Sequence, residues 1–269
     1  MSSVPIPPEP SADAERLATL EAELGDLGTL HEEPVNIPGL RTTLDVLRPT
    51  DTDRLLERAA DDPEQNLPYW AELWPSGIAL AAAIARQPHL VRGRRTLEIG
   101  CGLGITAAMA VALGARLLAT DYAPESLLLA RRNALRFAGA EPDTLQLNWR
   151  APDNPLLAAV EDDFAVVLAA DILYEARDVT PLLDLIERVV APRGLLWLAE
   201  PGRRPAGRFL EQAAAHGWAG ATTEWDGPWP DLKDEGVIVR VHQLRRRARA
   251  VRQCQRGRAQ VPPLLDKKP

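Results

Sequence analysis

The sequence predicts an α/β protein in which helices cover both faces of a mostly parallel β-sheet. From residue 96 onward, short apolar segments alternate with longer segments of helical periodicity, a pattern that favours parallel strands joined by helical crossovers. A glycine-rich turn, Gly100 to Gly104, follows the first of these segments and precedes a helical one. The last two segments are joined by 226–236, which has no helical pattern. We therefore expect that pair to be antiparallel, at one edge of the sheet.

The expected strands are 96–99, 116–120, 144–147, 164–170, 194–199, 221–225 and 237–244. The expected helices between them are 105–113, 124–137, 180–190 and 206–216. In such a sheet, ligands bind at the carboxyl ends of the strands.

The chain divides into three parts. Residues 1–65 form an N-terminal extension, with a proline-rich disordered start, a helix from Ser11 to Leu24, a hairpin over 33–49 and a short helix over 53–60. Residues 66–245 open with a helix over 78–86 and contain the alternating pattern, and we expect one domain there. Residues 246–269 form a basic tail, which we expect to be disordered.

Composition is that of an ordinary globular protein, with 46% hydrophobic and 26% charged residues in 269. No apolar run approaches the ~20 residues of a membrane span, and the N-terminus lacks a signal-peptide core. Two distant cysteines and four scattered histidines predict neither a disulfide framework nor a metal site. We expect a monomeric cytoplasmic protein of bacterial type that does not bind membranes.

Charge is unevenly distributed along the chain. The net charge is −7, yet 240–258 contains eight arginines and no acid. Such a segment can attract nucleic acid or an acidic protein, or it can be a solvated terminus. No aromatic residue lies among these arginines, so a nucleic-acid partner is not expected.

The glycine-rich turn predicts a backbone that a ligand approaches closely. Gly100, Gly102 and Gly104 let the chain turn sharply before a helix N-terminus, whose free N–H groups face the ligand. The dinucleotide fingerprint G-x-G-x-x-G would need glycine at 105, where isoleucine stands, and no Gly-Lys-Ser/Thr follows for a phosphate loop.

Two acidic residues near the turn favour a cationic ligand over a nucleotide that carries phosphate. Glu98 precedes the first glycine at the tip of its strand, where it would repel a pyrophosphate and suit a cationic group. Asp121 ends the next strand, where it can accept hydrogen bonds from both hydroxyls of a ribose. The alternative is that both acids cap helices or face solvent. A phosphate-free, positively charged nucleoside such as S-adenosylmethionine fits the pair.

At these residues the sequence resembles the class I, seven-β-strand S-adenosylmethionine-dependent methyltransferases. "LEIGCGLG" is similar to their first motif and "ATDY" to their acidic second one, and the resemblance covers about 68–244. It implies a Rossmann-like seven-stranded sheet of order 3-2-1-4-5-7-6 with strand seven antiparallel. Cofactor-binding residues are then Glu98, Gly100, Cys101, Gly102, Gly104, Asp121, Tyr122, Trp149 and Trp74. Trp149 is placed either beside the adenine or as a rim tryptophan on the sheet, and Trp74 on the cofactor side or in a structural role.

The end of the fourth strand bears on the methyl acceptor. Enzymes of this superfamily that methylate adenine or glutamine amides carry Asn/Asp-Pro-Pro-Tyr/Phe here, whereas this chain has Asp171-Ile-Leu-Tyr174. That sequence resembles the protein-lysine methyltransferase group. "LPYWAELWPSGIALA" and "AEPGRRP" are similar to segments of the electron-transfer-flavoprotein β-subunit lysine methyltransferases.

The resemblance suggests roles for the acceptor residues. Only a neutral amine attacks, and a lysine ammonium has an unperturbed pKa of ~10.4. Asp171 can pair with the ammonium and help pass its proton to water, while Tyr174 can hydrogen-bond the amine or face a cationic product. The expected substrate-binding residues are Trp70 in the alkyl channel, Glu175 as a source of negative potential, and Arg203 against an acidic partner surface. The structural alternatives are that Trp70 helps to clamp the helix over 78–86 to the sheet and that Arg203 is simply exposed to solvent.

Three functional hypotheses remain open. The first is methylation of lysine in a protein. The second is methylation of N, O or C in a small molecule on the same fold, since fold does not fix the acceptor. The third is a binding module that holds the cofactor or nucleic acid without turnover.

Overall fold

A computed structural model of the chain describes residues 12–60, 64, 67–151 and 164–246. The helices are α1 (Ala12–Glu23), α2 (Thr52–Ala59), α3 (Pro75–Arg86), α4 (Ile105–Ala112), α5 (Pro124–Ala138), α7 (Val179–Val189) and α8 (Arg204–Ala215). The strands are β1 (Leu30–Asn36), β2 (Thr43–Pro49), β3 (Arg95–Ile99), β4 (Arg116–Asp121), β5 (Asp143–Gln146), β6 (Phe164–Ala170), β7 (Val190–Glu200), β8 (Trp218–Trp225) and β9 (Val239–Arg246). The predictions for 1–11 and for the tail after Arg246 lie outside the described residues.

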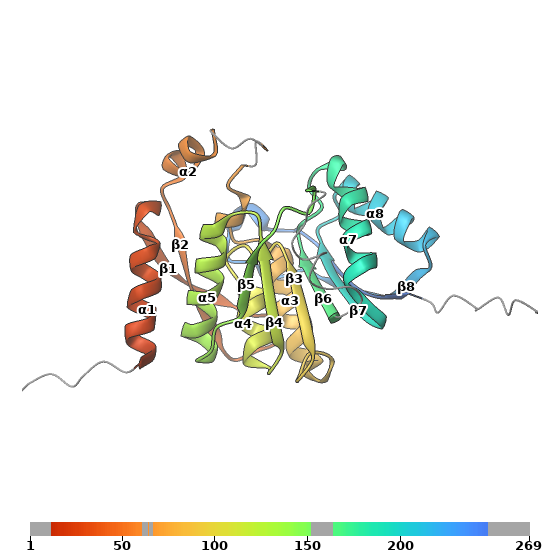
Figure 1. Cartoon of the computed structure of the whole chain (residues 1–269), viewed down its shortest axis with the longest axis horizontal. Helices are drawn as coiled ribbons and strands as arrows, with labels where there is room; N and C mark the ends of the chain where they lie inside the picture. The colour runs from red at the N-terminus through yellow and green to blue at the C-terminus, as the bar shows by residue number, and fades with distance from the viewer. Residues whose placement is uncertain (1–11, 61–63, 65–66, 152–163, 247–269) are drawn as a thin grey trace, which may run out of the picture.

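The main sheet has the predicted topology (Figure 1). Its seven strands follow the order β5-β4-β3-β6-β7-β9-β8. Strand β9 is antiparallel to both β7 and β8, while the remaining neighbours are parallel. In sequence order from β3, this is the predicted 3-2-1-4-5-7-6 arrangement with the seventh strand antiparallel.

Alternation along the central strand explains why helices cover both faces. In β6, Val166 and Leu168 are buried with α3 and α4, whereas Val167 and Ala169 are buried with α7 and α8. Helix α3 is buried continuously from Ile78 to Ile84, as expected for a helix that is apolar on all sides. Even so, none of the helices in the described ranges is both long and apolar enough to cross a bilayer.

Two strands are longer than the sequence predicts. Strand β7 begins at Val190 because the Pro192-Arg193-Gly194 segment, a break in the sequence pattern, is a bulge within the strand, with a register shift between Phe164 and Val166 on β6. Strand β8 begins at Trp218, which packs into the same core cluster as α8.

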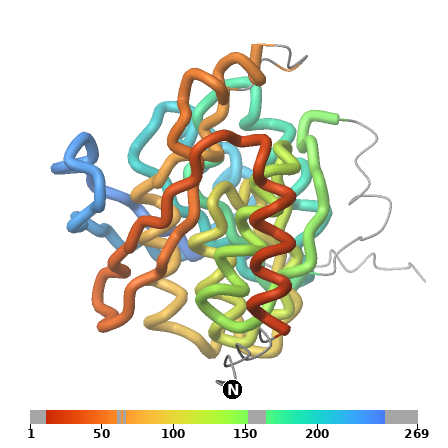
Figure 2. Tube along the Cα trace, turned by 90° about the vertical axis from the view of Figure 1, so that its left-hand side faces the viewer, coloured from red at the N-terminus to blue at the C-terminus, as the bar shows by residue number. Residues whose placement is uncertain are grey.

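The N-terminal segment forms the predicted hairpin and packs on the main domain. Strands β1 and β2 are antiparallel, and the turn between them contains Gly39, whose φ is +83°. Figure 2 shows α1 and the hairpin side by side against the rest of the molecule. Buried hairpin residues such as Val35 and Val46 share a core cluster with α3 and α4. The division at residues 65 and 245 stays a prediction.

Candidate active site

The glycines of the turn differ in how much space surrounds them. All have positive φ, of +70°, +50° and +77° for Gly100, Gly102 and Gly104. A Cβ on Gly104 would lie 2.4 Å from the Ala130 Cα on α5, so this glycine is needed for helix packing. A Cβ on Gly102 would meet nothing closer than the Trp70 carbonyl oxygen at 3.4 Å. Of these two, Gly102 is therefore the one that leaves space for a ligand.

A cavity of about 370 Å³ lies at the carboxyl ends of β3, β4 and β6. Helix α2 contributes Leu55, Arg58 and Ala59 to its wall, so part of the N-terminal segment borders the site. The structure brings together most of the residues that the sequence assigns to cofactor and acceptor. Those lining the cavity are Trp70, Trp74, Gly100, Gly102, Asp121, Tyr122, Trp149, Asp171 and Tyr174.

Glu98, Cys101 and Gly104 line a smaller adjoining space of about 50 Å³ that shares Gly100 and Gly102 with the main cavity. The Cys101 Sγ lies 3.5 Å from the Ser126 Oγ, and burial raises the pKa of this thiol well above its usual value. Cys101 is thus a neutral packing residue rather than a nucleophile. Ser126 donates to the Gly102 carbonyl oxygen at 2.8 Å and holds the turn.

Glu98 and Asp121 form a buried acidic pair beneath the turn. Glu98 is 2% exposed, and within the described residues its Oε2 has no hydrogen-bond partner. Burial, and then the charge of Asp121, hold the pKa of Glu98 well above its usual range. Asp121 accepts from the Gly102 N–H at 2.9 Å and the Ala123 N–H at 3.1 Å, and burial raises its pKa as well.

The pair fits a cationic nucleoside. A buried carboxylate oxygen without a partner is uncommon in folded proteins, and a bound cation would stabilise the charged form of Glu98. The Asp121 carboxylate also lines the cavity, where it can accept a hydrogen bond from a ribose hydroxyl. In the described part of the chain, no group of three or more His, Cys, Asp or Glu side chains is placed to hold a metal ion.

Asp171 directly follows β6. Its backbone has the left-handed conformation, with φ +54°, which costs a non-glycine residue of order 1–3 kcal/mol. Its N–H donates to the Ala199 carbonyl oxygen at 3.0 Å. Its Oδ1 accepts from the Arg203 Nε at 3.0 Å, and its Oδ2 from the Ser76 Oγ at 3.4 Å. Burial raises the pKa of Asp171, and the Arg203 guanidinium opposes that rise.

Aromatic rings pack against one another in the part of the cavity wall that contains Tyr174. The Tyr174 ring meets Tyr69 edge-on with centroids 5.2 Å apart, and Tyr69 meets Trp74 in the same way at 6.2 Å. Burial raises the pKa of Tyr174, so its hydroxyl stays protonated and can donate a hydrogen bond.

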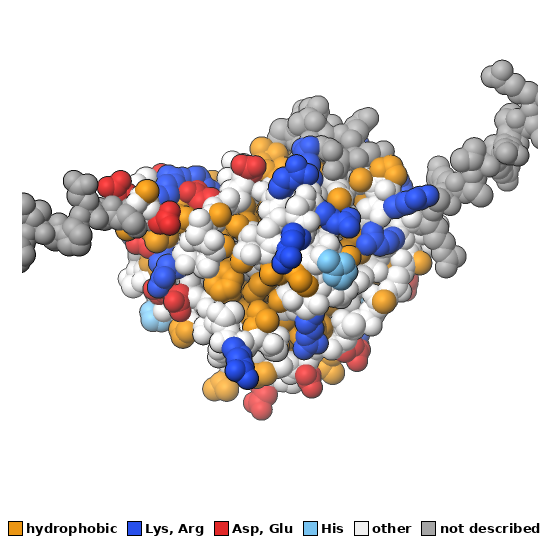
Figure 3. Space-filling model, turned by 90° about the horizontal axis from the view of Figure 1, so that it is seen from below, with side chains coloured by type: hydrophobic (Ala, Val, Ile, Leu, Met, Phe, Trp, Pro, Cys, Tyr) orange, Lys and Arg blue, Asp and Glu red, His pale blue; other side chains and the backbone are white. Residues whose placement is uncertain are grey.

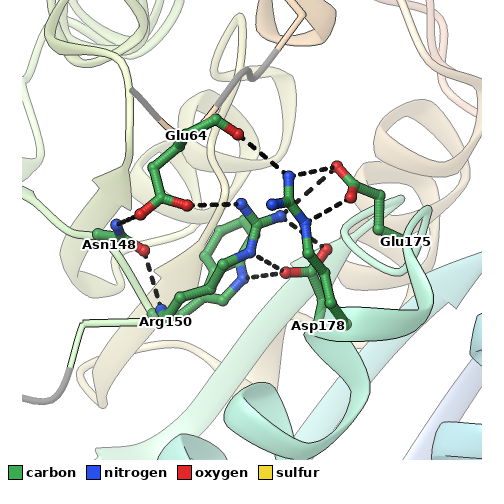
Figure 4. Close-up of polar contacts among 7 residues, drawn as sticks. Glu64, Asn148, Arg150, Glu175 and Asp178 are labelled. Atoms are coloured by element: carbon green, nitrogen blue, oxygen red, sulfur yellow. Dashed lines mark hydrogen bonds and ion pairs between the residues drawn. The ribbon is translucent and has the colours of Figure 1, made fainter. Parts of the chain in front are cut away.

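A polar network that sequence reasoning missed supports Trp149 (Figure 4). The Trp149 Nε1 donates to the Asp178 Oδ1 at 2.9 Å, and the Arg150 Nε donates to the same oxygen at 2.6 Å. Arg150 also contacts Glu64 at 3.3 Å, so this network joins three segments around the cavity. Trp149 therefore lines the cavity and is fixed by packing and hydrogen bonding at once. No local pattern pairs residues this far apart in the chain.

Two predicted substrate residues do not line the cavity. Glu175 pairs with Arg177 at 2.6 Å and Arg150 at 3.6 Å, and so belongs to the polar network. The Arg203 Nε lies 3.0 Å from the Asp171 Oδ1, and 38% of the Arg203 side chain stays exposed.

Comparisons with known proteins agree with this geometry. The model of a methyltransferase domain family matches residues 97–196. The electron transfer flavoprotein beta subunit lysine methyltransferase of Xenopus laevis is 30% identical over 164 residues, which cover 58% of this chain and 64% of that protein. The ubiquinone biosynthesis O-methyltransferase of Methylocella silvestris is 33% identical over 116 residues, 43% of each chain.

One solved structure, from work on the conversion of a disulfide bond into a thioacetal group during echinomycin biosynthesis, aligns with TM-score 0.51 at 17% identity. It covers 66% of this chain and 87% of that one, and shows likeness of fold alone. The chain spans 64% and 43% of the two curated relatives. The matched methyltransferase domain and the sheet order together support a class I S-adenosylmethionine-dependent methyltransferase.

Proposed function

We propose that this protein transfers a methyl group from S-adenosylmethionine to lysine side chains of a protein substrate. The observation that carries the proposal is the position of Asp171 and Tyr174, which follow β6 and both line the cavity. A carboxylate and a phenol hydroxyl are suited to receive an amine that must lose its proton before it reacts.

The cofactor end of the cavity is assigned to residues of β3 and β4. Bound S-adenosylmethionine would supply a methyl group carried on a positively charged sulfur. Glu98 would face a cationic part of this molecule, Asp121 would accept from its ribose, and Trp149 would border its adenine. The bare backbone at Gly102 would allow close approach.

The acceptor end would hold the lysine chain between aromatic walls. Trp70 and Trp74 line this part of the cavity, and their rings can pack along an alkyl chain. Asp171 would orient the amine and take part in removing its proton, and Tyr174 would donate to or face the nitrogen. At the rim, Leu67 and Tyr69 are 48% and 39% exposed, which leaves apolar surface for a protein substrate.

The relatives favour two acceptor classes. The Xenopus laevis relative is described as acting on lysine of the electron transfer flavoprotein beta subunit, and it carries the larger of the two alignments. The Methylocella silvestris relative supports the second candidate, a methyltransferase for a hydroxyl group of a small molecule. Under that alternative, Asp171 would accept the proton of the hydroxyl group.

The test measures transfer of labelled methyl from S-adenosylmethionine to material prepared from host cells that lack the gene. A soluble extract and the purified electron transfer flavoprotein of the same host would each be incubated with the enzyme. We expect label in protein, at lysine on mass spectrometry, and none with Gly102→Arg, whose side chain fills the cofactor space. Label confined to the small-molecule fraction would instead establish the second candidate.

A further control separates catalysis from binding. Asp171→Asn should bind the cofactor as the wild type does, on calorimetry, but transfer methyl slowly. If the wild-type chain binds the cofactor tightly and labels neither fraction, it is a binding module and the proposal is wrong.

A further inference from the structure

Arg203 contacts the site through Asp171. It lies in the loop between β7 and α8, and its Nε is 3.0 Å from the Asp171 Oδ1. The guanidinium carbon also lies 5.4 Å from the centroid of the Trp74 ring. Asp171 keeps only 5% of its side-chain surface exposed, against 38% for Arg203. Among the described residues, Arg203 is thus the counter-ion of this buried carboxylate, and it is partly exposed to solvent.

The loop that carries Arg203 is anchored to the sheet. Glu200 ends β7, and its carboxylate accepts from the Gly202 N–H and lies 3.3 Å from the His242 Nε2 on β9. The His242 Nδ1 lies 2.8 Å from the Thr222 Oγ1 on β8. Gly202 has φ +87°, which favours glycine and turns the chain toward the cavity. Three neighbouring strands therefore fix the base of the loop.

We propose that Arg203 is a positioning residue of the active site: from its anchored loop, it holds the Asp171 carboxylate ionised and correctly aimed at the acceptor end of the cavity. The role rests on the proposed function, because it concerns the group that would receive the acceptor amine.

The charges around Asp171 determine what removal of Arg203 would do. Burial raises the pKa of Asp171, Arg203 and the Ser76 hydroxyl lower it, and the nearby Glu200 carboxylate raises it. Without the guanidinium, the lowering effect is lost while burial and Glu200 remain, so the pKa of Asp171 rises further. A smaller fraction of the side chain is then ionised at a given pH, and the activity that needs the carboxylate is lost at a higher pH.

The first experiment is the pH profile of methyl transfer to the acceptor that the labelling experiment identifies. Because an opposite charge at this distance changes a carboxyl pKa by about 1–3 units, we expect the acid limb of kcat to move up by about one pH unit or more in Arg203→Met. Arg203→Lys keeps the positive charge, so its acid limb should lie close to that of the wild type. Arg204→Met is the matched control, since Arg204 is the exposed neighbour at the first position of α8. An unmoved acid limb in Arg203→Met would overturn the proposal.

A second experiment does not depend on activity. Urea unfolding of the wild type, Arg203→Met, Asp171→Asn and the double variant forms a double-mutant cycle. At pH 8, Asp171→Asn should raise the urea midpoint more in the Arg203→Met background than in the wild type, because it removes a buried charge that has lost its partner. Equal changes in the two backgrounds would show that Arg203 does not act on Asp171, whether or not the chain methylates lysine.

Discussion

Glu98 shows how burial prepares a single carboxylate for a charged ligand. Its side chain is 2% exposed, and one oxygen has no partner within the described residues. Its pKa is raised, first by burial and then by Asp121. The acid is therefore more readily protonated before a ligand binds than an exposed glutamate would be. A cationic ligand favours the ionised form, so binding and proton release are coupled.

We therefore predict that cofactor binding releases protons and strengthens as pH rises through the raised pKa of Glu98. Calorimetry of S-adenosylmethionine binding at pH 7, in buffers of different ionisation enthalpy, should detect the released protons. Glu98→Gln should weaken binding about tenfold or more, equal to ~1.4 kcal/mol, and abolish that release. Glu187→Gln, at the far end of α7, should change neither. An unchanged affinity in Glu98→Gln would place the cation elsewhere.

Gly104 provides a second test at the scale of one residue. We predict that Gly104→Ala destabilises the protein by several kcal/mol, because its Cβ would lie 2.4 Å from the Ala130 Cα. Gly139→Ala is the matched control: its φ of +65° carries similar backbone strain, but nothing lies within 4 Å of the new Cβ. It should cost about 1 kcal/mol. Urea unfolding measures both, and equal losses would mean that strain rather than packing fixes this glycine.

Sequence reasoning finds residues whose role follows from local spacing. Glu98 and Asp121 end adjacent predicted strands, so their meeting at one edge follows from the strand-helix pattern. Asp178 was missed because its partners, Trp149 and Arg150, follow β5, and no spacing brings them together. The orientation of Arg203 was missed for the same reason, since it depends on a loop fixed by residues of three strands.

Among the elements, α5 connects the N-terminal hairpin to the main sheet. The Asn133 side chain on α5 is 1% exposed. Its Oδ1 accepts from the Leu47 N–H at 2.9 Å, and its Nδ2 donates to the carbonyl oxygens of Leu47 and Leu103 at 3.1 and 2.9 Å. One amide thus satisfies buried backbone groups of both β2 and the glycine-rich turn region.

We predict that Asn133→Ala lowers the free energy of unfolding by about 2–4 kcal/mol, since it leaves several buried backbone groups unpaired. Arg136→Ala, on the exposed side of the same helix, removes only ion pairs at 3.5–3.6 Å and should cost less than about 1 kcal/mol. Urea unfolding gives both values. A loss below 1 kcal/mol for Asn133→Ala would mean that water replaces the amide.

Element types were predictable where periodicity is strong, and boundaries were not. The sequence places the strands and their crossovers correctly from 96 onward because buried strands and amphipathic helices differ in period. It begins strand β7 only at 194, whereas the strand starts at Val190 in the structure. Pairing continues past the bulge at 192–194, since the flanking Val190 and Leu195 are both buried against β6.

At the scale of the whole molecule, the two ends of the central strands carry different charged residues. The buried acids Glu98, Asp121 and Asp171 gather at the carboxyl ends of the central strands. Exposed arginines, including Arg92, Arg94 and Arg116, lie at the opposite end, where the strands begin. Figure 3 shows basic side chains spread over that end of the molecule. Burial raises the pKa of all three acids, the Asp121 charge raises that of Glu98 further, and the Arg203 guanidinium opposes the rise at Asp171.

This arrangement predicts how stability without the cofactor depends on pH. The pKa values of Glu98, Asp121 and Asp171 are all raised on folding, so folding favours their protonated forms. The stability that they contribute is present below the unfolded values of about 4, and it is lost as pH rises through the folded pKa values. A cationic cofactor favours the ionised acids, so its stabilising effect should grow over the same range. Thermal unfolding should be measured from pH 5 to 9. Without S-adenosylmethionine, Tm should fall as pH rises. The difference in Tm between the protein with and without S-adenosylmethionine should become larger over the same range. In Glu98→Gln both trends should flatten, because the most strongly perturbed acid no longer titrates, and parallel curves for the two proteins would place the titrating group outside the site.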